Sequence, residues 1–355
     1  MATGVLLINT GTADAPTKEA IRPYLYEFLM DPAIMGMPYF FRRILVKHIV
    51  LMRPARTVAH YEAFWTPEGS PFMITSRKQA KLVSEALNGA EGQEDGDFRV
   101  ELAMRYGNPS IASGLAKLRD AGCEKLVLVP MYPQNVYVCA GTCLKEAYDQ
   151  LKKLSAEGWT PEVTEVQDFY QQPAYCEALA QSVRDAWTYT PGAKLFVSFH
   201  STMMKDIETD DRYQVQTAWT KERLAADLGI PAEDVILSYQ SRFDSRKWLS
   251  PFTENVVRQL LDEGVTDICV VCPGFVADNI ETCIEVNRDL RAIVEYGTER
   301  LESTIRKGGH QPRLLAVSGP AELAAVPVNR FTYVPALGDN PGLIEAVAAA
   351  IREVL

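Results

Sequence analysis

The chain has 355 residues, of which 47% are hydrophobic and 23% are charged, and its formal net charge is −10. This composition is typical of an ordinary folded protein and excludes extensive disorder and collagen-like fibres. An acidic chain without a basic segment also lacks the positive surface that neutralises phosphates, which argues against a nucleic-acid partner. The length favours two compact domains.

Eight strand-like runs alternate with amphipathic stretches along the chain. They begin near Gly4, Phe98, Lys125, Glu162, Lys194, Asp234, Asp267 and Phe331. Several are continuously apolar, which is typical of parallel strands buried on both faces. Between the first two runs, Ile21, Tyr24, Leu25, Phe28 and Leu29 recur at helical spacing, and Pro23 predicts a kink or a late start. Strand and helix in alternation predict an α/β fold with mostly parallel sheets.

The segment from Pro32 to Met52 is the most apolar part of the chain, but Arg42, Arg43, Lys47 and His48 interrupt it. A bilayer-spanning helix needs about 18 apolar residues, so we expect no such helix here. The segment is typical of a core helix, or of an exposed lip that contacts a flat apolar ligand or a membrane surface. The first residues resemble no signal peptide, so a cytoplasmic location is expected, with peripheral contact to the inner membrane left open.

The two halves of the chain share three similar motifs in the same order. The runs that begin near Gly4 and Lys194 form one pair, and those near Lys125 and Asp267 form another. The ends of the runs that begin near Phe98 and Asp234 form the third. The pattern indicates either two similar α/β halves with a cleft between them or chance similarity between buried strands. Near the C-terminus, Asn340-Pro341 predicts a capped final helix.

Polar and aromatic residues follow several of the predicted strands, where ligands bind in open α/β sheets. They include Thr10, Arg105, Tyr106, Tyr132, Gln134, His200, Ser201, Gln240, Ser241, Arg242 and Phe275. His200 directly follows an apolar run. It is either a buried histidine bonded to backbone or a base or metal ligand. Neither a dinucleotide fingerprint nor a Walker loop is present, so we expect no nucleotide cofactor.

Four acidic residues after the seventh run recur at spacings of three or four. Asp278, Glu281, Glu285 and Asp289 would therefore share one helix face, where like charges repel. The row indicates either a solvated face or a track for a divalent cation. Oxygen and imidazole ligands would suit Fe²⁺. Cys139 and Cys143 could form a ligand pair or be separate thiols.

Seven motifs, in order, resemble the ferrochelatase family over nearly the whole chain. They are GVLLINTGTADAPT, YEAFWTPEGSPF, AMRYGNPSI, PMYPQ, SFHS, QSRF with WLSPFT, and CPGFVADNIET. The resemblance implies a chelatase-like α/β fold with two Rossmann-like domains, parallel sheets and a cleft between the domains. We expect residues 1–165 to form the first domain with the porphyrin lip. Residues 166–330 would form the second, with the histidine and acidic helix. Residues 331–355 would return to the first domain as a strand and a helix.

The resemblance also implies the activity and the residues that carry it. Fe²⁺ would be the substrate metal, inserted into protoporphyrin IX by ring distortion, pyrrole deprotonation and metal delivery. His200 and Glu281 would be catalytic, and the metal route would run along His200, Glu281, Glu285 and Asp278. Porphyrin and propionate contacts would be Arg53, Tyr61, Ser70, Arg105, Tyr106, Tyr132, Gln240 and Trp248.

Other readings of the same fold remain open. The alternatives are a coproporphyrin III ferrochelatase, a cobalt or nickel tetrapyrrole chelatase, and a non-catalytic porphyrin carrier. The chain ends at Leu355 without a cysteine-bearing extension, so an iron–sulfur cluster of the animal type is not expected. Either a monomer or a dimer is compatible with the sequence.

Overall fold

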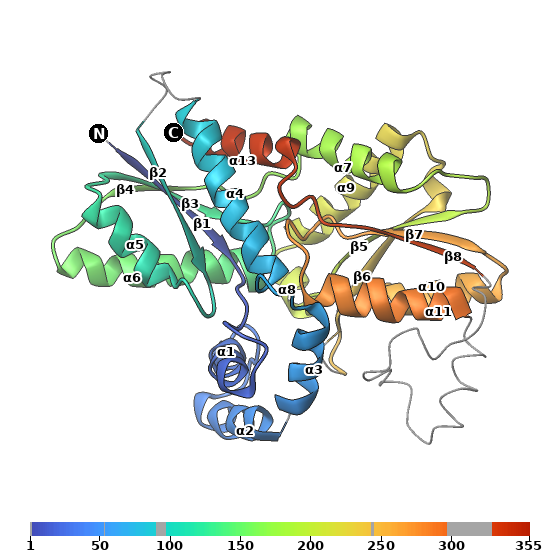
Figure 1. Ribbon diagram of the computed structural model, residues 1–355, viewed down its shortest axis with the longest axis horizontal. Helices are drawn as coiled ribbons and strands as arrows, with labels where there is room; N and C mark the ends of the chain where they lie inside the picture. Colours follow the sequence, from blue (N-terminus) through green and yellow to red (C-terminus); the bar gives the residue numbers. More distant parts are fainter. Residues whose placement is uncertain (1, 53, 90–96, 243–244, 297–328) are drawn as a thin grey trace. The chain divides into compact units, whose positions relative to one another are not determined.

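The computed structural model describes residues 2–52, 54–89, 97–242, 245–296 and 329–355. The chain divides into two compact units, Met1–Ala178 with Leu337–Leu355, and Leu179–Ala336. Each unit holds one four-stranded parallel sheet (Figure 1). The expected α/β fold with two parallel-sheet domains is therefore confirmed. We describe each unit by itself.

The first sheet has the strand order β2-β1-β3-β4, and all its strands are parallel. Its strands are β1 (Thr3–Asn9), β2 (Phe98–Met104), β3 (Lys125–Pro130) and β4 (Glu162–Glu165). Every β1 residue after the first is buried, as the continuously apolar sequence predicts. The sheet thus has both faces covered.

Helices cover the first sheet on both sides (Figure 1). Leu115 of α5 (Ile111–Asp120) and Cys143 of α6 (Thr142–Ala156) pack with Leu6 of β1 in one apolar core. A short π-helix, η1 (Tyr137–Gly141), leads into α6. The other face carries α4 (Pro71–Asn88) and α13 (Pro341–Glu353).

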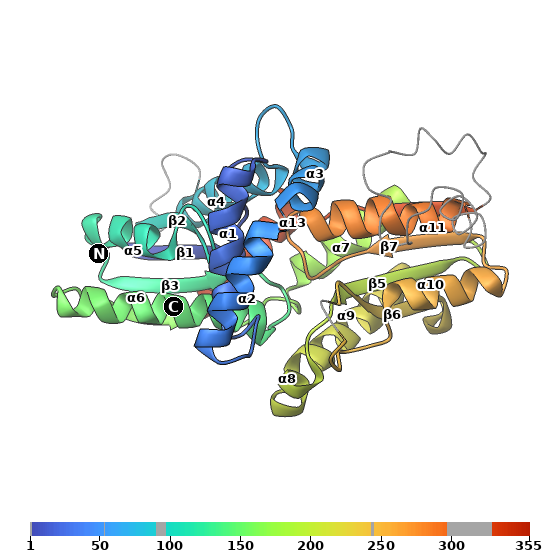
Figure 2. The same cartoon turned by 90° about the horizontal axis from the view of Figure 1, so that it is seen from below.

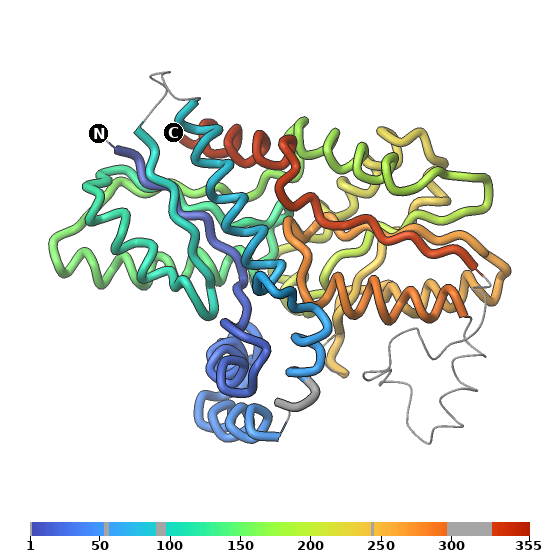
Figure 3. The backbone as a smooth tube through the Cα atoms, viewed as in Figure 1, coloured from blue at the N-terminus to red at the C-terminus, as the bar shows by residue number. Residues whose placement is uncertain are grey.

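The C-terminal helix belongs to the first unit. The chain leaves the second sheet and enters α13, which lies beside α4 (red and light blue in Figure 3). Arg352 donates to the carbonyl of Ala86 at 2.7 Å, and Gln79 donates to the carbonyl of Gly338 at 2.7 Å. Asn340 caps α13 by accepting from the amide of Gly342 at 2.8 Å. The predicted cap is thus confirmed.

Three helices lie beyond the carboxyl end of the first sheet (Figure 1). They are α1 (Lys18–Met30), α2 (Tyr39–Met52) and α3 (Pro54–Phe64). Thr17 caps α1, so the helix begins before Pro23 and a late start is ruled out. Apolar side chains of α2 are exposed, among them Phe40 at 67% and Phe41 at 64%. None of the helices in the described ranges is long and apolar enough to cross a membrane.

Gly11 makes a close approach possible at the end of β1. Its φ is +98°, and a Cβ there would lie 1.9 Å from the carbonyl oxygen of Tyr106. The amide of Tyr106 donates to the carbonyl of Thr10 at 2.9 Å, which holds the two strand ends together. Any residue with a side chain would have to break this contact, so glycine is required.

The second sheet has the order β6-β5-β7-β8 and is also parallel. Its strands are β5 (Lys194–His200), β6 (Val235–Gln240), β7 (Asp267–Val271) and β8 (Arg330–Val334). We expected the last strand to return to the first domain, and this was wrong. β8 pairs in register with β7, because its apolar residues Phe331 and Tyr333 join the core of the second unit.

Helices also cover both faces of the second sheet (Figure 2). On one face lie α10 (Thr253–Asp262), the π-helix η3 (Glu281–Leu290) and α11 (Arg291–Tyr296), whose apolar residues share a core with Phe196. On the other lie α9 (Arg212–Leu228) and α7 (Pro173–Ala186), a helix that spans the division between the units. The short elements α8 (Met204–Thr209) and η2 (Ala232–Asp234) flank α9.

The two sheets have the same topology. In each sheet, the first strand along the chain lies between the second and the third, and the fourth lies at the edge beside the third. β1 corresponds to β5, β2 to β6 and β3 to β7, which are the pairs that the repeated motifs connect. The prediction of two similar halves therefore holds for their topology.

Candidate functional site

His200 ends β5, and its hydrogen bonds define where its lone pair lies. Its Nδ1 lies 2.6 Å from the carbonyl oxygen of Ser201. A carbonyl can only accept, so Nδ1 carries the proton and the neutral ring has its lone pair on Nε2. The ring is half-buried and meets Phe275 edge-on at 6.4 Å. Tyr213 donates to the His200 carbonyl at 2.8 Å. The imidazole is thus held with Nε2 available as a base or ligand.

Three of the four acidic residues, Glu281, Glu285 and Asp289, lie on the π-helix η3, which begins at Glu281. Its i→i+5 winding is rare, and such segments occur frequently at functional sites. Glu285 accepts from the Ser241 hydroxyl at 2.6 Å. Ser241 follows β6 with a φ of 63°, a left-handed conformation that is uncommon for serine. The side chain of Glu281 has neither a hydrogen bond nor an ion pair within the described residues.

The electrostatics of the row fit the predicted repulsion between like charges. The Glu285 side chain is exposed, yet the protein around it raises its pKa to about 7 by desolvation, and the charges of Glu281 and Asp289 add to this. The Glu285 carboxylate therefore interacts with both of these neighbours.

Asp278 lies apart from that row, contrary to the expected single face. Its carboxylate accepts from the hydroxyl of Thr282 at 2.9 Å and from the hydroxyl of Tyr333 on β8. The amide of Ala336 also donates to it, at 3.4 Å. It thus faces the β8 edge of the sheet, whereas Glu285 contacts the segment after β6. Within the described ranges, no three His, Cys, Asp or Glu side chains form a group that could hold a metal ion.

Gln240 and Trp248 are the other expected porphyrin contacts in the second unit. Gln240 ends β6 directly opposite His200 in the strand register and is buried. Trp248 is half-buried and bridges in antiparallel fashion to Met203, which follows β5. Both residues thus lie near the carboxyl edge of the second sheet, where His200 also lies.

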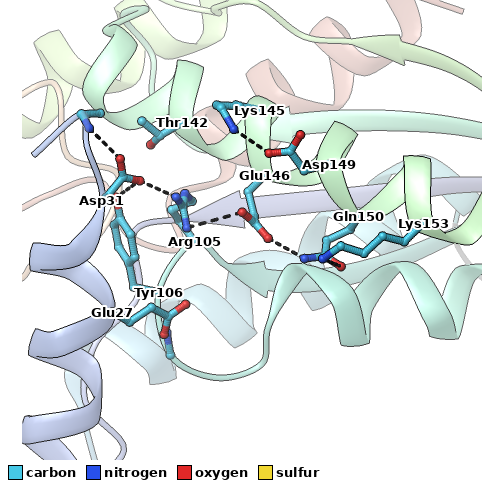
Figure 4. A network of polar contacts seen from close by, with 12 residues as sticks. Glu27, Asp31, Arg105, Tyr106, Thr142, Lys145, Glu146, Asp149, Gln150 and Lys153 are labelled. Carbon is cyan, nitrogen blue, oxygen red and sulfur yellow. Dashed lines mark hydrogen bonds and ion pairs between the residues drawn. The ribbon is translucent and has the colours of Figure 1, made fainter. Parts of the chain in front are cut away.

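In the first unit, Arg105 is already paired with an acidic residue that the sequence did not single out. Its Nη2 forms an ion pair with Asp31, the residue that ends α1 (Figure 4). Tyr106 donates from its hydroxyl to the same carboxylate at 3.0 Å, and Arg105 lies over the Tyr106 ring at 4.4 Å. Glu146 of α6 lies 4.0 Å from Nη1. Two carboxylates thus surround one guanidinium.

A pattern in α1 could have revealed Asp31. Residues on one side of the helix contact the carboxyl edge of the sheet at spacings of three and four. Tyr24 donates to the carbonyl of Gly11 at 3.3 Å, Glu27 accepts from the amide of Gly107 at 2.9 Å, Phe28 meets Tyr106 edge-on at 5.1 Å, and Asp31 completes the set. Of these residues, the apolar pattern of the sequence includes only Tyr24 and Phe28.

The remaining predicted porphyrin contacts of the first unit are mostly buried. Ser70 caps α4, accepting from the amide of Met73 at 3.5 Å. The hydroxyl of Tyr132 bonds that of Thr10, and burial raises the Tyr132 pKa. Tyr61 is buried beside Thr12, whose hydroxyl lies 3.5 Å from its own. Arg53 lies outside the described residues.

The seven cysteines are all free thiols. Cys139 is half-buried, and Cys143 is buried beneath it in the core of the first unit. Cys143 belongs to the same apolar core as Leu6 and Leu115, a position typical of a structural thiol. This environment fits separate thiols better than a ligand pair.

Comparisons with known proteins agree with one another. The family model named Ferrochelatase matches residues 2–308. The ferrochelatase of Thioalkalivibrio sulfidiphilus is 36% identical over 97% of this chain and 85% of its own length. Ferrochelatase 2 of Shewanella oneidensis is 34% identical over 99% of this chain and 97% of its own length.

The solved structure of SirB from Bacillus subtilis with Fe³⁺ has a TM-score of 0.50 and 12% identity, and the match covers 100% of this chain and 96% of that one. It supports the fold alone. The matches to these two curated relatives cover 97–99% of this chain and 85% and 97% of the relatives' own lengths. The chain therefore belongs to the ferrochelatase family.

Proposed function

We propose that this protein is a ferrochelatase that inserts Fe²⁺ into protoporphyrin IX in haem biosynthesis. The observation that carries the proposal is the family match over nearly the whole chain, together with His200 at the expected strand end. In the overall reaction Fe²⁺ enters the ring and two pyrrole N–H protons leave. The protein must therefore supply a base and a route for the cation.

His200 is proposed as the group that takes a pyrrole proton or first contacts Fe²⁺. The hydrogen bond from Nδ1 to the Ser201 carbonyl supports this role, because it leaves the lone pair on Nε2. His200→Ala is expected to abolish nearly all turnover while porphyrin binding persists. Absorbance measures turnover, and fluorescence quenching measures binding. Loss of binding with turnover per bound porphyrin unchanged would contradict the role.

Glu281 and Glu285 are proposed to relay the cation or protons. Their carboxylates interact along η3, and Glu281 has no competing partner among the described residues. Asp278 was expected on the same metal route. Its carboxylate already accepts from three donors and is less available as a metal ligand, so we assign Asp278 the smallest role in moving the cation or protons.

Porphyrin contacts are proposed for Tyr61, Ser70, Arg105, Tyr106, Tyr132, Gln240, Trp248 and Arg53, as the family resemblance implies. Binding energy from such contacts can hold the macrocycle in a bent form that exposes a nitrogen lone pair. The pairing of Arg105 with Asp31 limits what Arg105 can offer a propionate, so its contact would be through the ring face or through Tyr106.

The deciding experiment offers Fe²⁺ anaerobically with protoporphyrin IX or coproporphyrin III and follows the absorbance of the metallated product. Faster conversion of protoporphyrin IX that is lost in Glu281→Ala supports the proposal. Preference for coproporphyrin III would reassign the substrate. Binding without insertion, unchanged by Glu281→Ala, would indicate a carrier or a chelatase for another metal. Iron and sulfide analysis of the same protein tests the expected lack of an animal-type cluster.

We propose that the protein is cytoplasmic and contacts the membrane surface through α2. Exposed Phe40 and Phe41 share the exposed surface of α2 with the basic residues Arg43 and Lys47. Apolar side chains flanked by basic ones suit the surface of anionic lipids. Co-sedimentation with anionic vesicles should fall in the double variant Phe40→Ser, Phe41→Ser. It should persist in Val215→Ser, which removes an exposed apolar residue from α9.

A further inference from the structure

Three buried hydroxyl groups lie beneath the side chain of Gln240. Ser198 on β5 and Ser238 on β6 are register partners two residues before His200 and Gln240, so all four share one face of the sheet. Thr253, the first residue of α10, lies between the two serines. Its Oγ1 is 2.7 Å from Ser198 Oγ and 2.9 Å from Ser238 Oγ. The three residues are almost fully buried.

The direction of these hydrogen bonds is fixed by the group at their end. Ser198 donates to Gln240 Oε1 at 3.0 Å, so its only proton is used there. Thr253 must therefore donate to Ser198, and Ser238 must donate to Thr253. The thiol of Cys272 also points to Gln240 Oε1, at 3.7 Å. The amide oxygen thus accepts from both the Ser198 hydroxyl and the Cys272 thiol.

The opposite amide orientation would be worse for the same groups. Nε2 would donate to Ser198, and each hydroxyl proton would turn the other way along the chain. The last proton, on Ser238, would then have no acceptor among the described residues, and the Cys272 thiol would face an N–H. Among the described residues, the opposite orientation thus leaves one amide N–H, the Ser238 hydroxyl and the Cys272 thiol without an acceptor and Oε1 without a donor, whereas the observed orientation leaves only the two N–H groups unpaired. Each unpaired buried group costs free energy. The chain therefore selects one orientation of the Gln240 amide.

This orientation leaves two N–H donors of Gln240 without an acceptor. Gln240 is only 7% exposed, and its Nε2 is buried with no hydrogen-bond partner in the described part of the chain. It ends its strand directly opposite His200. Buried polar groups in proteins are nearly always paired with protein, ordered water or ligand, so this donor at a strand end can take an acceptor from a ligand that enters there.

We propose that Ser198 is a positioning residue, which, through the Ser238–Thr253–Ser198 chain, holds Gln240 Nε2 ready to donate to an acceptor atom of the porphyrin. The inference rests on the proposed function, which supplies the porphyrin. A porphyrin offers two kinds of acceptor, the propionate carboxylates and the ring nitrogens that carry no proton. Either would satisfy the donor, and the orientation set by Ser198 removes the need to turn the amide on binding.

The test is a double-mutant cycle on porphyrin affinity, measured without iron by fluorescence quenching. Gln240→Met removes the donor and is expected to weaken protoporphyrin IX binding about ten-fold, which is one good hydrogen bond. Ser198→Ala frees the amide to turn. If both orientations become equally populated, Kd rises about two-fold. In the Gln240→Met background, Ser198→Ala should not raise Kd further. A purely structural role of Ser198 would raise Kd in that background as well.

Controls separate orientation from folding. Ser198→Thr keeps the hydroxyl and should restore affinity, and Ser182→Ala removes a half-buried hydroxyl of α7 that only bonds a backbone carbonyl. In turnover assays KM should rise in Ser198→Ala while kcat is kept. If Ser198→Ala does not fold, Ser238→Ala removes the first donor of the chain and takes its place in the cycle.

The two acceptors are distinguished by etioporphyrin, which carries alkyl groups in place of propionates. A loss in Gln240→Met with both porphyrins assigns the ring nitrogens, and a loss with protoporphyrin IX alone assigns a propionate. Unchanged affinity in Gln240→Met, or additive losses in the cycle, would overturn the inference. Wild-type protein that neither binds nor metallates a porphyrin would instead refute the proposed function.

Discussion

The ion pair between Asp31 and Arg105 is expected to hold α1 against the first sheet. Side-chain exposure is 5% for Asp31 and 14% for Arg105, so both charges are largely removed from water. Asp31 also accepts from the Tyr106 hydroxyl at 3.0 Å and from the amide of Ala33 at 2.7 Å. Asp31→Asn removes the charge and keeps a side chain of the same shape.

The expected cost follows from the burial of the guanidinium that remains. Breaking a buried pair by removing one partner costs about 3–5 kcal/mol, because the other charge is left uncompensated. Glu146 is 4.0 Å from Arg105 and 29% exposed, so it compensates part of that charge. We therefore expect the lower end, about 3 kcal/mol. Removing both charges, in Asp31→Asn with Arg105→Met, should cost less than the sum of the single changes by about 2 kcal/mol.

Hydrogen exchange read by mass spectrometry is the suitable assay, since a two-unit protein need not unfold in one step. Peptides covering β1 and β3 report opening of the first unit, and peptides covering β5 and β7 serve as an internal control. The free energy of opening should fall in the first set alone. Glu146→Gln should then lower the free energy of opening of the first unit more in the Asp31→Asn background than in the wild type. A loss below about 1 kcal/mol in Asp31→Asn, or strict additivity with Arg105→Met, would refute the reasoning.

Three further predictions concern charge and helix ends. The pKa of Glu285 is raised from its ordinary 4.5 to about 7, so the folded protein binds this proton more tightly than the unfolded chain between those pH values. Its contribution to stability therefore falls as pH rises through that window. The melting temperature of Glu285→Gln, relative to that of the wild type, should thus increase between pH 5 and pH 8. The hydrogen bond from Lys194 lowers the pKa of Asp234, a stabilisation that is lost as pH falls through the lowered value. Lys194→Met should thus cost about 2 kcal/mol in urea unfolding at pH 7 and less near pH 3, and an equal cost at both would contradict this. Asn340→Ala should cost about 1 kcal/mol by loss of the α13 cap, with exposed Val215→Ser as a near-neutral control.

The strands and the fold class could be predicted because they depend on local patterns. Continuously apolar runs became buried parallel strands, and the repeated motifs fell on corresponding strands of two sheets with one topology. The place of His200 at a strand end followed from the same reasoning. The position of Asn340 before Pro341 likewise predicted its cap, because a helix cap depends on neighbouring residues alone.

Contacts between residues far apart in sequence could not be predicted in this way. Asp31 and Arg105 are separated by 74 positions, and no sequence pattern around either residue indicates the other as its partner. Asp278 matched the spacing of the acidic row, yet Tyr333, 55 positions away, holds it at the β8 edge. Spacing describes which residues share a helix face, whereas hydrogen bonds to other elements decide which way each side chain turns.

The sequence by itself determined the alternation of strand and helix, the family and the residues at the strand ends, because periodicity and motif order are properties of the chain alone. Tertiary structure decided that β8 joins the second sheet, that Arg105 is paired with Asp31, and that Ser198 is bonded to the Gln240 amide. Each of these depends on which polar and apolar groups meet when separate elements pack together. Burial makes an unpaired group costly, so only the packed structure shows where every donor and charge finds its partner.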